Sequence, residues 1–200
     1  MTTDIGLLAG KIRLLESELE AELAKRGAEL RVGLENGRVA FEQEVLRRHR
    51  ELKTGLWRYI RNANPLVALT APFIYALIVP FLMLDLFVTI YQIVCFPAYG
   101  LSKVRRRDYL VFDRHHLAYL NLLEKFNCAY CSYANGLLAY VGEIASRTEQ
   151  HWCPIKHARR LQGTHSRYLG FADFGDADAY RKELEDLSRK AQARAEASST

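Results

Sequence analysis

Four side chains in the second half of the chain have the types and the spacing of a metal site. Two residues separate the cysteines of the first pair, and three residues separate the cysteine and histidine of the second: Cys128, Cys131, Cys153 and His157. Residues three or four apart on a helix project from nearly the same side. Three thiolates and one imidazole suit the tetrahedral coordination of Zn²⁺. We therefore predict a zinc site where two antiparallel helices bring the pairs together.

Other chemistries can use the same residues. The cluster could hold iron or an iron–sulfur centre, or Cys128 and Cys131 could form a redox pair with Cys153 as the resolving thiol. The cysteines could also act as small hydrophobic side chains. Glu124 and His116 could support the metal ligands or replace one of them. The sequence contains none of the phosphate-loop, Gly-x-Ser-x-Gly or His-Glu-x-x-His motifs, so no catalytic signature points to an enzyme class.

A long apolar segment determines the broad class of the protein. Residues 62–102 contain one formal charge, Asp85, and this composition predicts insertion into a membrane. A straight helix over the most apolar part, residues 66–101, would be about 54 Å long, whereas the hydrocarbon layer is about 30 Å thick. Pro80 lies near the middle and should bend a helix. We expect a hairpin bent near Pro80 or a single crossing over residues 73–95.

Basic residues flank the apolar segment on both sides. The net charge is +5, and Lys and Arg beside a membrane segment attract anionic lipid headgroups. Lys and Arg also collect on the cytoplasmic side of membrane segments, so two basic flanks favour the hairpin, with both soluble parts on the cytoplasmic face. The basic residues form no separate module, which argues against nucleic-acid binding. The predicted headgroup contacts are Arg58, Arg61, Lys103, Arg105, Arg106 and Arg107.

The acid within the apolar segment requires an explanation of its own. An unpaired carboxylate at the centre of a bilayer costs about 2.5–3.5 kcal/mol on insertion scales. Asp85 is therefore expected to be paired, protonated or engaged in a mechanism.

Helical periodicity marks the remaining parts of the chain. Apolar residues recur every three or four positions in the N-terminal arm, as in one interrupted helix or in two helices folded at Asn36-Gly37. An aromatic-rich helical face follows over residues 113–147. We divide the chain into an amphipathic, coiled-coil-like arm, residues 1–62; a membrane segment, residues 63–102; a helical domain with the Cys/His cluster, residues 103–175; and a charged helix with a disordered tail, residues 176–200.

These features predict an all-α, membrane-associated protein. The role we favour is a non-enzymatic scaffold or assembly protein, anchored in the membrane, whose zinc ion staples a cytoplasmic helical module too small to be stable alone. Its expected partners are a bilayer with anionic headgroups and either a second copy or another membrane protein. The alternatives are a membrane-bound metal or thiol redox enzyme and a small transport or channel component.

Overall fold

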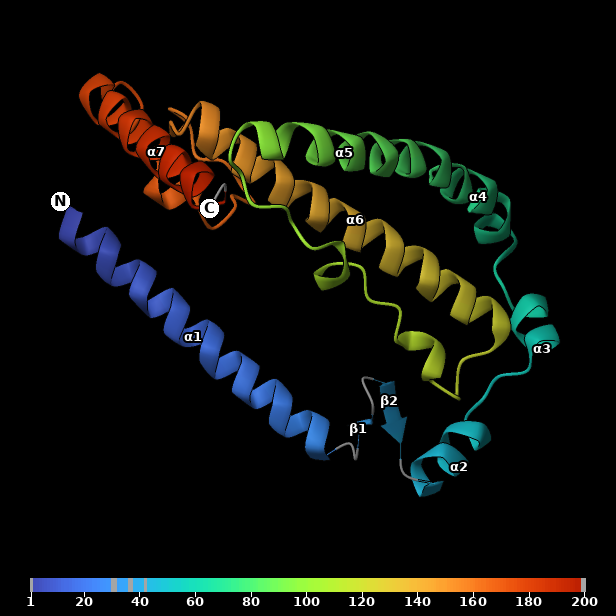
Figure 1. Ribbon diagram of the computed structural model, residues 1–200. Coiled ribbons are helices and arrows are strands. Elements are labelled where there is room, and N and C mark those ends of the chain that lie inside the picture. The colour runs from blue at the N-terminus through green and yellow to red at the C-terminus, as the bar shows by residue number, and fades with distance from the viewer. Residues whose placement is uncertain (1, 30–31, 36–37, 42, 199–200) are drawn as a thin grey trace. The chain divides into compact units, whose positions relative to one another are not determined.

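The structure is a computed structural model that describes residues 2–29, 32–35, 38–41 and 43–198. Helices predominate among these residues (Figure 1). The chain divides into two compact units, residues 1–62 with 113–129 and residues 63–112 with 130–200. The predicted helical character is therefore confirmed for most of the chain, with one exception in the first unit.

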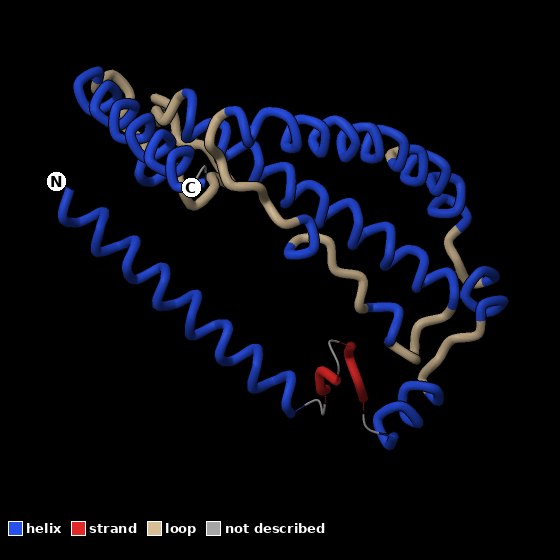
Figure 2. Tube along the Cα trace, in the orientation of Figure 1, coloured by secondary structure: helices blue, strands red, loops and turns tan. Residues whose placement is uncertain are grey.

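The exception is a β-hairpin in the N-terminal arm (Figure 2). Helix α1 (Thr2–Glu29) is followed by β1 (Val32–Glu35) and β2 (Arg38–Phe41), which pair antiparallel. Alternation of apolar and polar residues and β-branched side chains favour strands here, and a helical reading of this stretch was wrong. The predicted turn at Asn36-Gly37 lies outside the described residues. The unit continues with α2 (Gln43–Glu51) and α3 (Leu56–Arg61).

The apolar segment forms one helical path instead of a hairpin. Helices α4 (Pro65–Ala76) and α5 (Ile78–Ala98) meet at Leu77 and continue in the same general direction (Figure 1). Together α4, Leu77 and α5 cover 34 residues, Pro65–Ala98, a helical stretch long and apolar enough to cross a membrane. The interruption follows from Pro80, because a proline ring clashes with the carbonyl group four residues earlier, and α4 ends at that residue. The proline interrupts the helix without turning it back.

Helix α6 (Leu122–Trp152) is continuous over 31 residues. From Tyr130 onward it runs parallel to α5, and the two helices lie side by side (Figure 1). The rings of Tyr75 and Tyr130 lie 5.8 Å apart, and those of Tyr99 and Trp152 lie 5.3 Å apart. The C-terminal ends of α5 and α6 therefore lie together.

The core of the second unit lies between α5, α6 and the segment after α5. Its buried apolar side chains are Phe96, Val104, Leu137, Tyr140 and Ile144. Short 3₁₀ turns occur at Arg106–Asp108, Arg114–His116 and Tyr168–Gly170. The last helix, α7, spans Ala177–Ser198, so helix extends into the predicted disordered tail, whose last two residues lie outside the described residues.

Candidate functional site

The structure does not bring the predicted zinc ligands together. Helix α6 is continuous, and Cys153 is the first residue after it. Cys131 and Cys153 are therefore about 30 Å apart along the helix axis. The four cysteines of the chain are free thiols. No group of three His, Cys, Asp or Glu side chains among the described residues could hold a metal ion. The donor set therefore does not fit a tetrahedral site within one chain, and zinc remains a prediction without support from this geometry.

Other contacts account for the residues near the predicted metal site. The Glu124 carboxylate accepts a hydrogen bond from the Asn121 backbone N–H (2.8 Å), and the Asn121 side chain accepts one from the Glu124 N–H (3.0 Å). This reciprocal pair is a capping box that starts α6. The His157 backbone N–H donates to the Tyr168 hydroxyl (2.6 Å). His116 lies in a 3₁₀ turn, with its ring 3.9 Å from that of His115.

The acid of the apolar helix is paired, as one reading of the sequence required. The Arg106 guanidinium donates two hydrogen bonds to the Asp85 carboxylate, of 2.5 and 2.6 Å, and the Tyr133 hydroxyl donates a third of 2.8 Å. The Asp85 side chain is only 10% exposed. A bidentate arginine is the strongest partner that a buried carboxylate can find among side chains. The Asp85 side chain therefore has its hydrogen-bond partners within the protein.

This pairing also changes the role of one predicted headgroup contact. Arg106 was expected to face lipid headgroups, but its guanidinium is engaged with Asp85. The other five predicted contacts are exposed: Arg58 and Arg61 on α3, and Lys103, Arg105 and Arg107 after α5.

A glutamine makes a second polar contact on the inner face of α5. Gln92, which is 6% exposed, donates to the Tyr140 hydroxyl (2.8 Å) and accepts from the Val104 backbone N–H (2.6 Å). The side chain thereby joins α5, α6 and the segment after α5. Sequence reasoning missed this residue, for which the one signal was its polarity within an apolar helix.

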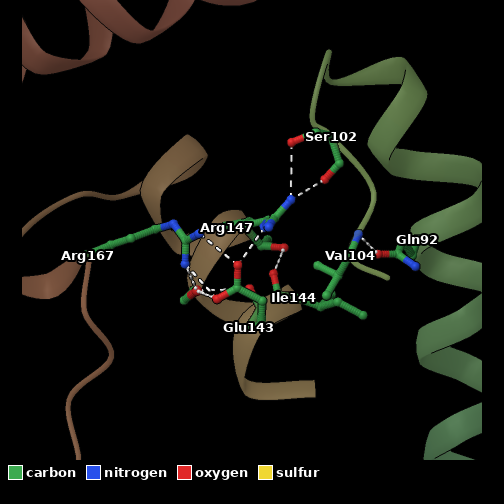
Figure 3. A network of polar contacts seen from close by, with 9 residues as sticks. Gln92, Ser102, Val104, Glu143, Ile144, Arg147 and Arg167 are labelled. Carbon is green, nitrogen blue, oxygen red and sulfur yellow. Dashed lines mark hydrogen bonds and ion pairs between the residues drawn. The ribbon is translucent and has the colours of Figure 1, made fainter. Parts of the chain in front are cut away.

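The most extensive polar network surrounds Glu143 on α6 (Figure 3). Its carboxylate accepts two hydrogen bonds of 2.7 Å from Arg167 and one of 2.8 Å from Nε of Arg147. Arg167 also donates to the hydroxyl of Ser146 (2.8 Å). Arg147 reaches the carbonyl oxygen of Ser102 (2.6 Å). The network thus connects α6 to the segment after α5 and to the loop that carries Arg167.

The electrostatics of this network favour the ionised pair. Burial by itself would raise the pKa of Glu143, but the hydrogen bonds and charges of Arg167 and Arg147 outweigh it and hold this pKa below its ordinary value. The same contact with Glu143 raises the pKa of Arg167. A carboxylate already bound by two guanidinium groups is poorly placed to accept a proton from a substrate. The arrangement is therefore that of a structural network.

Two cavities lie against the loop between α6 and α7. The first, of about 480 Å³, borders the Glu143 network and includes the Glu149–His165 pair, whose side chains are 2.9 Å apart. The second, of about 740 Å³, is here named the basic cavity, and no Asp or Glu lines it among the described residues. Its basic lining residues are Lys156, His157, Arg159 and Arg160.

The acids of the two networks and the cations of the basic cavity have different surroundings. Asp85 and Glu143 are both saturated by arginine, whereas the basic cavity has cationic groups and no carboxylate in its wall. No protein-family model, curated protein or solved structure matches the chain.

Proposed function

We propose that this chain is a monotopic membrane protein that serves as a non-enzymatic scaffold. In this proposal α4 and α5 lie along one face of the bilayer, with their outer side in lipid and both soluble arms on the cytoplasmic side. The observation that carries the membrane placement is the contact between Arg106 and Asp85, because it fixes a basic segment beside the middle of the apolar helix.

The two sides of α5 differ in a way that suits one lipid-facing side. The outer side chains of the helix are largely exposed, for example Phe87 (62%) and Val94 (63%). The inner side carries Asp85 and Gln92, which are buried against the rest of the unit. On α4, Phe73 is 76% exposed. A helix with this many large apolar side chains exposed on a folded protein indicates contact with lipid or with another protein.

The position of the basic segment favours a helix in the plane of the membrane over a crossing. Arg106 pairs with the mid-helix acid, so its neighbour Arg107, whose side chain is 80% exposed, also lies near the middle of α5. In an upright helix this exposed charge would lie at the depth of the hydrocarbon centre, where it costs several kcal/mol. In a helix lying flat, the same charge faces water or headgroups.

The scaffold role rests on the N-terminal helix. On α1 a stripe of apolar side chains, Leu8, Ile12, Leu15, Leu19 and Leu23, is 49–63% exposed. The spacing of the first four matches the a and d positions of a coiled coil. In a parallel pair of such helices, Lys11 would face Glu16 of the second copy, which adds charge complementarity. We infer that α1 pairs with a second copy and that the pair presents the membrane-bound modules together.

The metal and redox alternatives receive no specific support from the described residues. Zinc as a staple and thiol chemistry remain predictions, because the four predicted ligands do not meet within one chain. Metal analysis of the purified protein tests both. One tightly bound zinc per chain, lost from the Cys131→Ser and the Cys153→Ser variants alike, would require an arrangement different from the one described.

Membrane placement is tested by cysteine labelling. In a chain whose four cysteines are replaced by serine, Ala63→Cys and Lys103→Cys introduce a thiol at either end of the apolar path. A membrane-impermeant maleimide should label both positions from the cytoplasmic face of sealed vesicles, and neither from the opposite face. Labelling of the two positions from opposite faces would establish a crossing and end the monotopic proposal.

Self-association is tested separately with matched leucine variants. Leu15→Ala with Leu19→Ala removes two stripe residues, whereas Leu7→Ala with Leu14→Ala removes two leucines of equal exposure outside the stripe. Sedimentation equilibrium in detergent should show a dimer for the native chain and the control and a monomer for the stripe variant. A monomeric native chain, or equal behaviour of both variants, would contradict the scaffold role.

A further inference from the structure

The loop that forms the basic cavity is held in place where it leaves α6. Ile155 and Ala172 form an isolated parallel bridge, in which the Lys156 N–H donates to the Ala172 carbonyl (2.8 Å). The Ala172 N–H donates to the Pro154 carbonyl (2.9 Å), and Pro154 is buried. The Lys156 ammonium pairs with Asp173 at 2.8 Å. Backbone hydrogen bonds and an ion pair therefore join the residues on either side of the loop.

Further contacts fasten the loop on its other side. The Tyr168 hydroxyl accepts the His157 N–H (2.6 Å), which ties the two ends of the cavity wall together. Arg167 binds Glu143 through both of its terminal nitrogens. The chain bends at Gly163, whose φ of +70° is a conformation that L side chains rarely adopt. A loop fixed at both ends holds its cationic residues around one cavity, which lowers the entropic cost of binding a ligand.

Two arginines of the cavity wall, Arg159 and Arg160, have no acidic partner among the described residues. Arg159 and Arg160 are exposed and line a cavity whose described wall contains no carboxylate. Lys156, a third cation of the wall, pairs with Asp173, which lies outside the cavity wall. Arginine presents a planar fork of donors that matches the oxygens of a phosphate group, and it binds such groups in a bidentate manner. Thr164, which also lines the cavity, supplies a hydroxyl donor.

The loop that forms the cavity begins just after the end of α6, which lies beside the end of the apolar helix α5. Tyr99, the C-cap of α5, stacks on His151 and contacts Trp152, which is 54% exposed. Tyr and Trp are enriched where membrane segments meet the headgroup layer. The wall of the basic cavity begins four residues after Trp152, at Lys156. If the apolar helix lies in lipid, as proposed above, this cavity is near lipid phosphates.

We propose that the basic cavity is a binding site for a phosphate monoester, held by Arg159 and Arg160. The source that its position favours is the headgroup of an anionic lipid such as phosphatidic acid. A soluble phosphate is the other source with the same chemistry. The lipid source rests on the proposed membrane placement, whereas the phosphate site itself does not.

The test uses isothermal titration calorimetry on the full chain in a neutral detergent. Three ligands are compared: inorganic phosphate, short-chain phosphatidic acid and short-chain phosphatidylcholine. The protein should bind phosphatidic acid in preference to phosphatidylcholine. Equal binding of inorganic phosphate would support the site with a soluble source, and binding of phosphatidic acid alone would support the lipid source. Because these measurements do not depend on how the chain lies in a bilayer, they distinguish a failure of this site from a failure of the monotopic placement.

Matched variants make the result specific to the cavity. Arg159→Ala with Arg160→Ala should weaken binding by about tenfold or more, since two charge-assisted contacts are lost. Arg181→Ala with Lys182→Ala removes the same charge from exposed positions of α7 and should leave binding unchanged. Arg159→Lys with Arg160→Lys keeps the charge without the bidentate geometry and should be intermediate. Failure of the native chain to bind phosphate or phosphatidic acid, or equal weakening by both alanine pairs, would overturn the proposal.

Discussion

The guanidinium of Arg106 and the carboxylate of Asp85 face each other through two parallel hydrogen bonds, of 2.5 and 2.6 Å, across 21 residues of sequence. The pair joins the acid of the apolar helix to the basic run that follows it. It therefore makes the position of that basic run depend on one buried carboxylate.

Replacing Arg106 by alanine should lower the free energy of unfolding more than replacing Asp85 by asparagine. In Arg106→Ala the buried Asp85 carboxyl keeps the Tyr133 hydroxyl but loses its cation, and we expect a loss of about 2 kcal/mol in the free energy of unfolding, moderated by the partial exposure of Arg106. Asp85→Asn keeps an acceptor for Tyr133 and should lose less. Thermal unfolding in detergent micelles measures both. Arg107→Ala is the control, because its side chain is 80% exposed, and a loss as large as that of Arg106→Ala would contradict the assigned role.

The glutamine on the inner face of α5 gives a second prediction. Gln92→Leu keeps the size of the side chain but leaves the Val104 N–H buried without an acceptor, which should cost about 1–3 kcal/mol. Tyr140→Phe removes the other hydrogen bond of Gln92. Because both changes act on one chain of contacts, the double variant should be less destabilised than the sum of the single variants. Additive losses in chemical unfolding experiments would show that the two bonds are independent.

The Glu143 network should make stability depend on pH in a defined direction. Arg167 and Arg147 lower the pKa of Glu143 from its ordinary value of 4.5, so the folded state favours the ionised carboxylate. The resulting stabilisation is complete above about pH 4.5, the pKa expected for the unfolded chain, and is lost as the pH falls through the lowered pKa of the folded chain. Glu143→Gln lacks this dependence. The difference in unfolding free energy between native chain and variant should be constant from neutral pH to about 5 and then shrink; a difference that grows on acidification would contradict it.

The apolar segment was recognised from the sequence, whereas the signal at the start of its helix, Asn64-Pro65, was not used. The long run of apolar residues predicted a membrane segment, and Asn64 followed by Pro65 is the N-cap of α4, with the Asn64 side chain 2.9 Å from the Leu66 N–H. Pro80 correctly indicated an interruption near the middle. A helix–helix reversal was not required by these signals, because one proline changes only the local hydrogen bonding.

The polar contacts could not be derived in the same way. The pairs Asp85–Arg106, Gln92–Tyr140 and Glu143–Arg167 are 21, 48 and 24 residues apart, and no periodicity relates their members. The Cys/His spacing shows the limit of a local signal. Its local geometry was sound, but the 21 residues between Cys131 and Cys153 continue the same helix, so the two pairs lie apart.

Two glycines of α6 have different surroundings, and this difference yields a specific prediction. A Cβ added at Gly136 would lie 2.6 Å from the Tyr109 carbonyl oxygen and 3.2 Å from the Leu110 Cα, both of which belong to the backbone. At Gly142 the same addition would meet nothing within 4 Å. Gly136→Ala must therefore displace the segment after α5 and should destabilise the protein by about 1–3 kcal/mol.

The matched change has the opposite sign. Gly142→Ala places a better helix former at an exposed helical position and should stabilise the protein by about 0.5–1 kcal/mol. Both variants replace the same residue by the same residue within one helix, so helix propensity alone would stabilise both. Thermal unfolding of the two variants side by side thus separates propensity from packing. If Gly136→Ala unfolded at or above the temperature of the native chain, the close contact between α6 and the backbone at Tyr109 would be absent in solution.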